Sequence, residues 1–207
     1  MILRSLSETR GVITLMFDEG QSLRVRRKHF AKLPLNEGDP VDFEEYENAL
    51  SRIQFDDATE AALTLLDHSA QSVMGLRQKL MQKGYVPFCV EQVIARLQEY
   101  RLLDDAALAQ RFTQSRLHAQ DGIYAVRRKL RARGVDEETA RQAVEDLMDD
   151  AQQLEAALAA LRKLYPRYAD RPSREARARL SQALARRGFS WDVISQALDR
   201  FLSDEPD

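Results

Sequence analysis

The chain has 207 residues, of which 44% are hydrophobic and 31% are charged, and its formal net charge is −2. This composition is typical of a globular protein rather than a disordered chain, and the scarcity of Gly, with 8 residues, favours helices. No apolar run approaches the ~18 residues that cross a bilayer, no secretion signal is visible, and the single Cys89 excludes an internal disulfide, so we expect a cytoplasmic protein without a membrane segment.

The first 54 residues predict a small β-rich module. Residues 12–17 and 23–25 carry alternating apolar side chains around Gly20, which indicates a β-hairpin. Residues 43–53 carry apolar side chains at helical spacing, which predicts a short helix. Four basic residues lie on or just after the second strand: Arg24, Arg26, Arg27 and Lys28. They would either contact phosphates or keep an exposed strand edge soluble, and we favour the second interpretation.

A phrase of one apolar residue, two aspartates and an alanine occurs three times in the rest of the chain. Its copies are residues 55–58, 103–106 and 148–151. An aspartate at the start of a helix accepts hydrogen bonds from unpaired backbone N–H groups. We therefore interpret each copy as a helix start, in preference to a catalytic or metal-binding pair of carboxylates.

A second phrase also occurs three times, and it ends in Gly84-Tyr85, Gly134-Val135 and Gly188-Phe189. Each copy has basic residues in a last helical turn, a Gly able to adopt the left-handed conformation, and an apolar residue that folds back, which together predict a helix end. The following helices would begin at Pro87, after Asp136 and after Ser190.

These phrases predict a mainly α protein with three tandem three-helix repeats. The repeats would form an elongated, curved array behind the small N-terminal module that contains the β-hairpin. The expected divisions are 1–54, 55–103, 104–147 and 148–207, and the last repeat contains an inserted bend at 165–172.

The residues of the middle repeat resemble the central signature of RecX proteins. The similarity rests on Leu102-Leu103-Asp104-Asp105, Ala109, Arg116, Gly122, Val126, Leu130 and Arg133-Gly134-Val135, with a similar flank from Leu76 to Gly84. It covers about residues 55–202. The resemblance implies a helical regulator that binds RecA along the groove of its filament on DNA and inhibits strand exchange and ATP hydrolysis. It thereby implies a role in recombination, DNA repair and the SOS response, and no chemistry of its own.

The middle repeat also has an unusual distribution of charge. Residues 111–133 contain seven basic residues and one acid, whereas 136–155 contain eight acids and one base. On the second helix of this repeat, the side of the helix opposite the apolar positions carries Tyr124, Arg127, Arg128 and Arg131, which we call the arginine face. The equivalent positions of the other repeats are Met74, Arg77, Gln78 and Met81, and Ala178, Ser181, Gln182 and Ala185.

A surface needed only for solubility would be similarly polar in all three copies, so the arginine face is a candidate for binding DNA or an acidic surface of RecA. The sequence does not distinguish these two targets. The full candidate site comprises Arg111, Arg116, Tyr124, Arg127, Arg128, Lys129, Arg131 and Arg133. A possible second basic patch comprises Arg171, Arg174, Arg177 and Arg179. Met74 and Met81 form an apolar strip that we expect to pack against the N-terminal module.

No enzyme chemistry is expected from the sequence. His29, His68 and His118 lie far apart without partners at the spacing of metal ligands, and no phosphate-binding loop is present, so we expect neither a metal nor a cofactor. The expected partners are the RecA filament and single- or double-stranded DNA, and a monomer is the simplest state. Two alternatives remain: a helical DNA-binding protein that needs no RecA, and a helical protein–protein scaffold.

Overall fold

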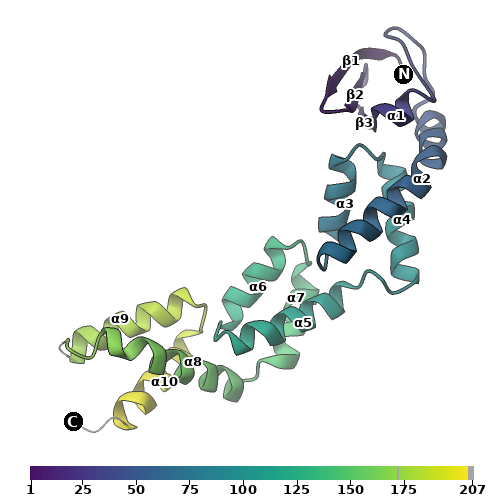
Figure 1. Ribbon diagram of the computed structural model, residues 1–207. Coiled ribbons are helices and arrows are strands. Elements are labelled where there is room, and N and C mark those ends of the chain that lie inside the picture. The colour runs from purple at the N-terminus through teal and green to yellow at the C-terminus, as the bar shows by residue number, and fades with distance from the viewer. Residues whose placement is uncertain (172, 205–207) are drawn as a thin grey trace. The chain divides into compact units, whose positions relative to one another are not determined.

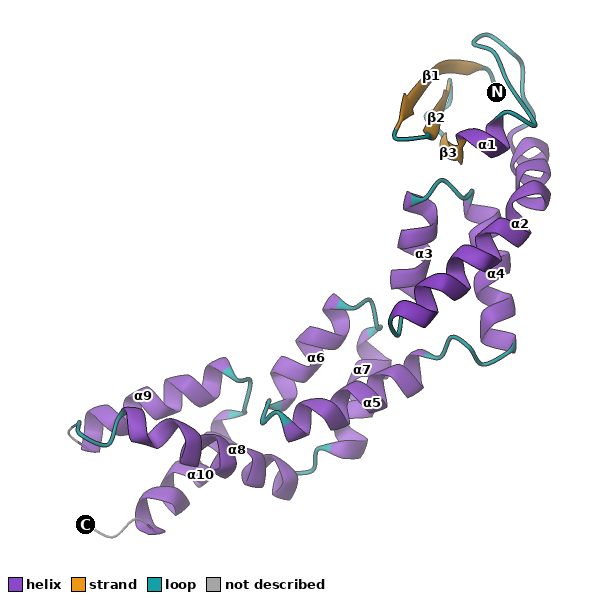
Figure 2. Cartoon of the chain, in the orientation of Figure 1, coloured by secondary structure: helices purple, strands orange, loops and turns teal. Residues whose placement is uncertain are grey.

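The computed structural model describes residues 1–171 and 173–204, and it divides into two compact units, Met1–Asp104 and the chain from Asp105 onward (Figure 1). Helices predominate in both units, and the strands are confined to the N-terminal part of the first (Figure 2). Each unit is described by itself below. In the part of the chain that the structure covers, no helix combines the length and apolar character needed to cross a membrane.

Unit 1 begins with a three-stranded antiparallel sheet. The strands are β1 (Leu3–Thr9), β2 (Val12–Phe17) and β3 (Ser22–Arg26), in the order β1-β2-β3. The predicted hairpin is β2–β3, and its Leu15, Leu23 and Val25 are buried. Strand β1 was not predicted because it is mostly exposed, with only Leu3 buried, and so lacks the apolar alternation that identifies a strand.

A short helix α1 (Arg27–Phe30) leads to α2 (Phe43–His68), whose 26 residues form one continuous helix. The predicted end near Ile53 is wrong, and so is the predicted helix start at Asp56-Asp57, which lie in the middle of α2. No Gly or Pro occurs between Phe43 and His68, so nothing in the sequence interrupts the helix. The helix start is instead capped by the Asp42 carboxylate, which accepts from the Glu45 N–H.

Helices α3 (Val73–Gln82) and α4 (Pro87–Glu99) complete the first three-helix repeat with the second half of α2. The expected helix end is present at Gly84, whose φ is 87°, and Pro87 opens α4 as expected. The repeat and the sheet share one core of buried apolar side chains. The N-terminal module and repeat 1 are therefore parts of one packed unit.

Unit 2 contains six α-helices and one 3₁₀ turn among its described residues. They are α5 (Asp105–His118), α6 (Ile123–Ala132), α7 (Glu137–Leu147), α8 (Asp150–Leu164), η1 (Tyr165–Arg167), α9 (Ser173–Arg186) and α10 (Trp191–Asp204). The aspartate phrases begin α5 and α8 as predicted, and Asp149 forms a reciprocal capping box with Gln152. Tyr165-Pro166 opens the predicted bend, whereas Pro172 lies outside the described residues.

Repeats 2 and 3 meet where α6 begins and where the chain turns between α9 and α10. The Gly122 N–H donates to the Arg187 carbonyl over 2.8 Å, and the Tyr124 N–H donates to the Gly188 carbonyl over 3.0 Å. A Cβ on Gly122 would lie 2.3 Å from the Gly188 carbonyl carbon, so the two backbones touch with no room for a side chain. We call this junction the Gly122–Gly188 contact.

Candidate anion-binding interface

The arginine face lies on α6, which buries its opposite side. Ala125, Val126 and Leu130 are buried within unit 2, which fixes the rotation of the helix about its axis. Tyr124 is 54% exposed, and Arg128 and Arg131 are also exposed. Guanidinium groups and an aromatic ring thus lie on one accessible surface.

Arg127 lies differently from the outward orientation that the helical period predicts. Its side chain is half-buried and forms an ion pair with Glu137 of α7, and the same carboxylate lies 3.1 Å from Arg131. The hydrogen bond from Arg127, together with the charges of both arginines, holds the pKa of Glu137 below its usual value. The helical period gives the direction of a side chain but cannot reveal an acid contributed by the next helix. Glu137 therefore neutralises part of the arginine face.

Three other predicted residues turn toward neighbours within the repeat. Lys129 and Arg116 both lie near the Asp121 carboxylate, at 2.5 and 3.8 Å. Arg133 lies over the Phe112 ring at 4.7 Å from its centroid, and Arg116 lies over the same ring at 5.2 Å. These cation–π contacts hold the guanidinium planes of both arginines against the ring.

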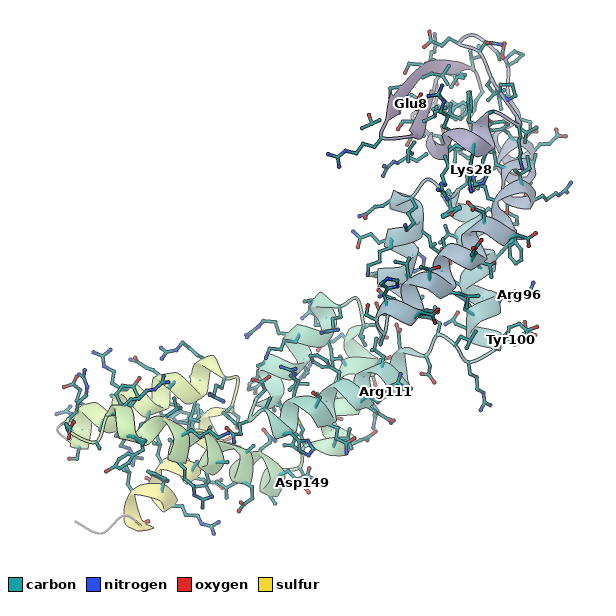
Figure 3. All side chains as sticks on the ribbon, in the orientation of Figure 1. Glu8, Lys28, Arg96, Tyr100, Arg111 and Asp149 are labelled. Carbon is teal, nitrogen blue, oxygen red and sulfur yellow. The ribbon has the colours of Figure 1, made fainter. Side chains whose placement is uncertain are left out.

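Arg111 and Arg128 are the two basic residues of the candidate site that no residue in the described part of the chain compensates. Both are exposed, and neither has an ion pair with any residue that the structure describes. Arg111 lies on α5 (Figure 3), and Arg128 lies one turn beyond Tyr124 on α6. An unpaired exposed guanidinium can bind a phosphate or carboxylate without first breaking an internal ion pair.

The possible second patch is largely compensated. Arg171 pairs with Glu175, whose carboxylate also lies 3.8 Å from Arg179, and Arg177 lies 2.6 Å from Asp199. Arg174 is exposed and has no ion-pair partner in the described parts of the chain. The sequence offered no sign of these pairs except the position of Glu175 one turn from two of the arginines.

In unit 1, basic residues after the hairpin gather around Asp57 of α2. Its carboxylate accepts from Arg26 and from the Tyr85 hydroxyl, each at 2.8 Å, and pairs with Lys28 (Lys28 is labelled in Figure 3). His29 is 3% exposed, and its Nε2 lies 3.3 Å from Asp57. These contacts connect the end of the sheet to repeat 1. Arg26 and Lys28 therefore have a structural role, in addition to the solubility of the strand edge that was expected of them.

Burial and charge act in opposite directions on the pKa values of this cluster. Burial alone would raise the pKa of Asp57, but hydrogen bonds from Lys28 and Tyr85 and the charges of Arg26 and Lys28 outweigh it and leave that pKa low. For His29, burial outweighs the attraction of Asp57 and lowers the pKa. Asp57 is thus a structural anion that Tyr85 and the basic residues hold in place.

The methionine strip stays accessible beside the sheet. Met74 is 58% exposed, and with Met81 it lines a groove that also includes Ser22 and Arg24 of β3. The strip lies beside β3 but stays exposed, so the expectation that it packs against the N-terminal module is wrong.

Trp191 is an exposed aromatic that the sequence analysis did not identify as a candidate. It opens α10, three residues after Gly188, and it is 72% exposed. A comparison of the three repeats could have identified it, because the equivalent residues in repeats 1 and 2 are Pro87 and Glu137. Only repeat 3 has an aromatic residue at this position.

No group of three or more His, Cys, Asp or Glu side chains that could hold a metal ion occurs among the residues described. Cys89 is buried, and burial raises the pKa of its thiol to about 11, so the thiol stays protonated near neutral pH. The described surface therefore carries exposed charged and aromatic side chains that could bind a partner.

Comparison with known families finds three matches along the chain. Residues 58–97 match the family described as "RecX, first three-helix domain", 104–144 match the second three-helix domain, and 150–198 match the third. The middle match contains the whole arginine face.

Individual relatives and solved structures agree with these matches. Regulatory protein RecX of Prosthecochloris aestuarii is 34% identical over 143 residues, which cover 69% of this chain and 89% of that protein. Regulatory protein RecX of Clostridioides difficile is 29% identical over 175 residues, covering 84% and 82%. The crystal structure of RecX from Lactobacillus salivarius is similar in fold, with a TM-score of 0.70 and 22% identity over 73% of this chain and 99% of that one.

Proposed function

Since the chain belongs to the RecX family of regulatory proteins, we propose that it binds the filament that RecA forms on DNA and inhibits the recombinase and ATPase activities of RecA. It would act in the cytoplasm, as a monomer and without a cofactor, and so modulate recombination, DNA repair and the SOS response. Its partners would be RecA and the single- or double-stranded DNA within the filament.

The arginine face is the observation that carries this proposal. Arg128 is exposed and unpaired among the described residues, and with Arg111 it adds uncompensated positive charge to the repeat that matches the second RecX domain. Both DNA and an acidic surface of RecA would complement this charge. A protein with no polyanionic partner would have no need for such a face in one repeat alone.

The direct test is RecA ATP hydrolysis on single-stranded DNA, with this protein added below the concentration of RecA. Inhibition that rises with added protein is expected. If the folded protein has no effect on hydrolysis or on strand exchange, the proposal fails. Salt-dependent DNA binding without any effect on RecA would then favour a DNA-binding protein that needs no RecA, and the absence of both would favour a protein–protein scaffold.

Charge reversal at Arg128 is expected to weaken inhibition. Arg128→Glu replaces an exposed cation by an anion, and we expect the concentration for half-maximal inhibition to rise about tenfold, since one lost charge pair contributes about 1.4 kcal/mol to binding. Arg162→Glu on α8 is the matched control, because Arg162 is also exposed and without an ion pair in the described structure but lies outside the candidate site. Equal inhibition by the two folded variants would rule out the arginine face.

Removing the internal acid should have the opposite effect. Glu137→Gln frees Arg127 and Arg131 from their shared partner, so both become available to an external anion. We expect half-maximal inhibition at a concentration about two- to fivefold lower, because an exposed ion pair is weak. Glu138→Gln changes the same charge at the next position, where the partner is Arg141, and should leave inhibition unchanged. A gain that is equal in both variants would indicate only a general effect of net charge.

A further inference from the structure

Tyr124 and Trp191 are the two large apolar side chains that stay exposed in the described part of unit 2, at 54% and 72%. Exposed aromatic rings are costly to keep in water, and they are common at binding sites, where one face of the ring contacts a ligand. The two residues come from different repeats, so their relative placement depends on the junction between repeats 2 and 3.

The Gly122–Gly188 contact brings these two residues into one region of the surface. The Tyr124 N–H donates to the Gly188 carbonyl over 3.0 Å, and Trp191 follows Gly188 by three residues. Since consecutive Cα atoms are about 3.8 Å apart, the Cα of Trp191 lies within ~11 Å of that of Gly188. A strand of nucleic acid advances about 3.4 Å per nucleotide when stacked, so the backbone positions of the two residues lie within the span of about five nucleotides.

The helices that meet at this junction also carry positive charge that no described residue compensates. Arg128 lies one turn beyond Tyr124, and Arg186 ends α9 just before the turn at Gly188. Both arginines are exposed and lack an ion pair with described residues. Arg187 instead donates to the Gln120 carbonyl over 3.3 Å, which fastens the junction from the side of repeat 3. Asp192, next to Trp191, is the nearest acid in the sequence.

We propose that Tyr124, Arg128, Arg186 and Trp191 form a binding site for single-stranded nucleic acid, which we call the aromatic seam. Bases would stack on Tyr124 and Trp191, while phosphates pair with Arg128 and Arg186. The inference rests on the proposed function and deepens it, because it assigns DNA rather than RecA as the partner of this surface.

The geometry favours a single strand over a duplex. Bases in a duplex are already stacked on each other and cannot lie flat on a protein ring, whereas unpaired bases can. Helices that read duplex DNA place their N-terminal residues in the major groove. Here the N-terminus of α6 is covered by the α9–α10 turn through the Gly122–Gly188 contact. The end of the helix that would enter the groove is therefore occupied.

Trp191 is the single tryptophan of the chain, so its intrinsic fluorescence reports directly on this site. Titration of the full chain with oligothymidylate at low salt should quench this fluorescence, and the quenching should saturate together with the anisotropy of a labelled oligonucleotide. Tyr124→Ala should weaken binding of the labelled oligonucleotide at least fivefold, since each stacked base contributes about 1–3 kcal/mol. Tyr100→Ala removes a similarly exposed ring from unit 1 and should leave the affinity unchanged.

The outcomes separate this inference from the proposed function. Suppose that RecA is inhibited, that the oligonucleotide does not quench Trp191, and that it binds folded Tyr124→Ala as tightly as the parent protein. The aromatic seam is then wrong and the proposed function stands. Quenching and loss of affinity in Tyr124→Ala without inhibition of RecA would support the seam and contradict the proposed function. Equal quenching by a duplex or by polyglutamate would overturn the assignment to a single strand.

Discussion

Gly188→Ala is expected to destabilise unit 2 by about 3–5 kcal/mol. The φ of Gly188 is 84°, where any other residue costs roughly 1–2 kcal/mol. An added Cβ would also lie 2.3 Å from the Ala125 nitrogen, which forces the α6 N-terminus away from the turn. That movement breaks the two backbone hydrogen bonds of the Gly122–Gly188 contact, at about 1 kcal/mol each. Urea unfolding followed by the fluorescence of Trp191 measures the loss.

Two matched variants separate strain from close approach. Gly20 has the same φ of 84°, but nothing lies within 4 Å of its would-be Cβ, so Gly20→Ala should cost only the strain of roughly 1–2 kcal/mol in unit 1, measured by circular dichroism. Gly122 has an ordinary φ of −82°, so Gly122→Ala tests the close approach alone. If Gly122→Ala were as stable as the parent protein, the tight contact between repeats would be refuted.

Asp57→Ala is expected to loosen the N-terminal module from repeat 1 and to cost about 2–3 kcal/mol. The change removes the acceptor of Arg26, Lys28 and Tyr85, and it leaves His29 beside uncompensated cations. The estimate is moderate because Arg26 and Lys28 are partly exposed and water screens their charges. Urea unfolding by circular dichroism gives the loss, and hydrogen exchange of the amides in β3 locates it.

The neighbouring aspartate is the control for this variant. Asp56 belongs to the same phrase but is exposed and has no ion pair with any described residue, so Asp56→Ala should change stability by less than about 0.5 kcal/mol. The advantage of the parent protein over Asp57→Ala should depend on pH. Because the pKa of Asp57 is lowered in the folded state, the advantage is full at neutral pH and declines as pH falls below about 4. Equal losses in the two variants would show that Asp57 has no special role.

The local features of the repeats could be predicted because each depends on a few neighbouring residues. The left-handed Gly at each helix end and the caps at Asp136, Asp149 and Ser190 follow from the chemistry of single turns. The mainly α fold with three repeats follows from the recurrence of those turns, and the family matches confirm it.

Features that depend on distant residues were not predicted. Asp57 has the same local sequence as Asp105 and Asp150, yet it lies in the middle of α2, and its partners come from β3, from α1 and from the turn between α3 and α4. Strand β1 was not predicted because it is stabilised by pairing with β2 and has no alternation of apolar residues in its sequence. Comparison of the repeats therefore predicts where helices end more reliably than where they begin.

For the candidate site too, local features could be predicted from the sequence, whereas contacts between helices could not. The internal comparison found the arginine face because a difference between repeats is visible in the sequence. It could not show that Glu137 neutralises Arg127 and Arg131, since that contact joins two helices. Nor could it relate Tyr124 to Trp191, because the two repeats that carry them are joined by a backbone contact that the sequence does not reveal.

The Gly122–Gly188 contact also bears on how this half of the chain folds. In many repeat proteins, each repeat adds its own stability and a modest term for its neighbour, so folding can stop at any boundary. Here the first turn of α6 hydrogen-bonds to the turn of the next repeat, and Leu117 packs on the cores of both repeats. Neither repeat can lose its structure without exposing backbone donors and apolar surface of the other. We therefore expect repeats 2 and 3 to unfold as a single cooperative unit, although the sequence contains them as two separate repeats.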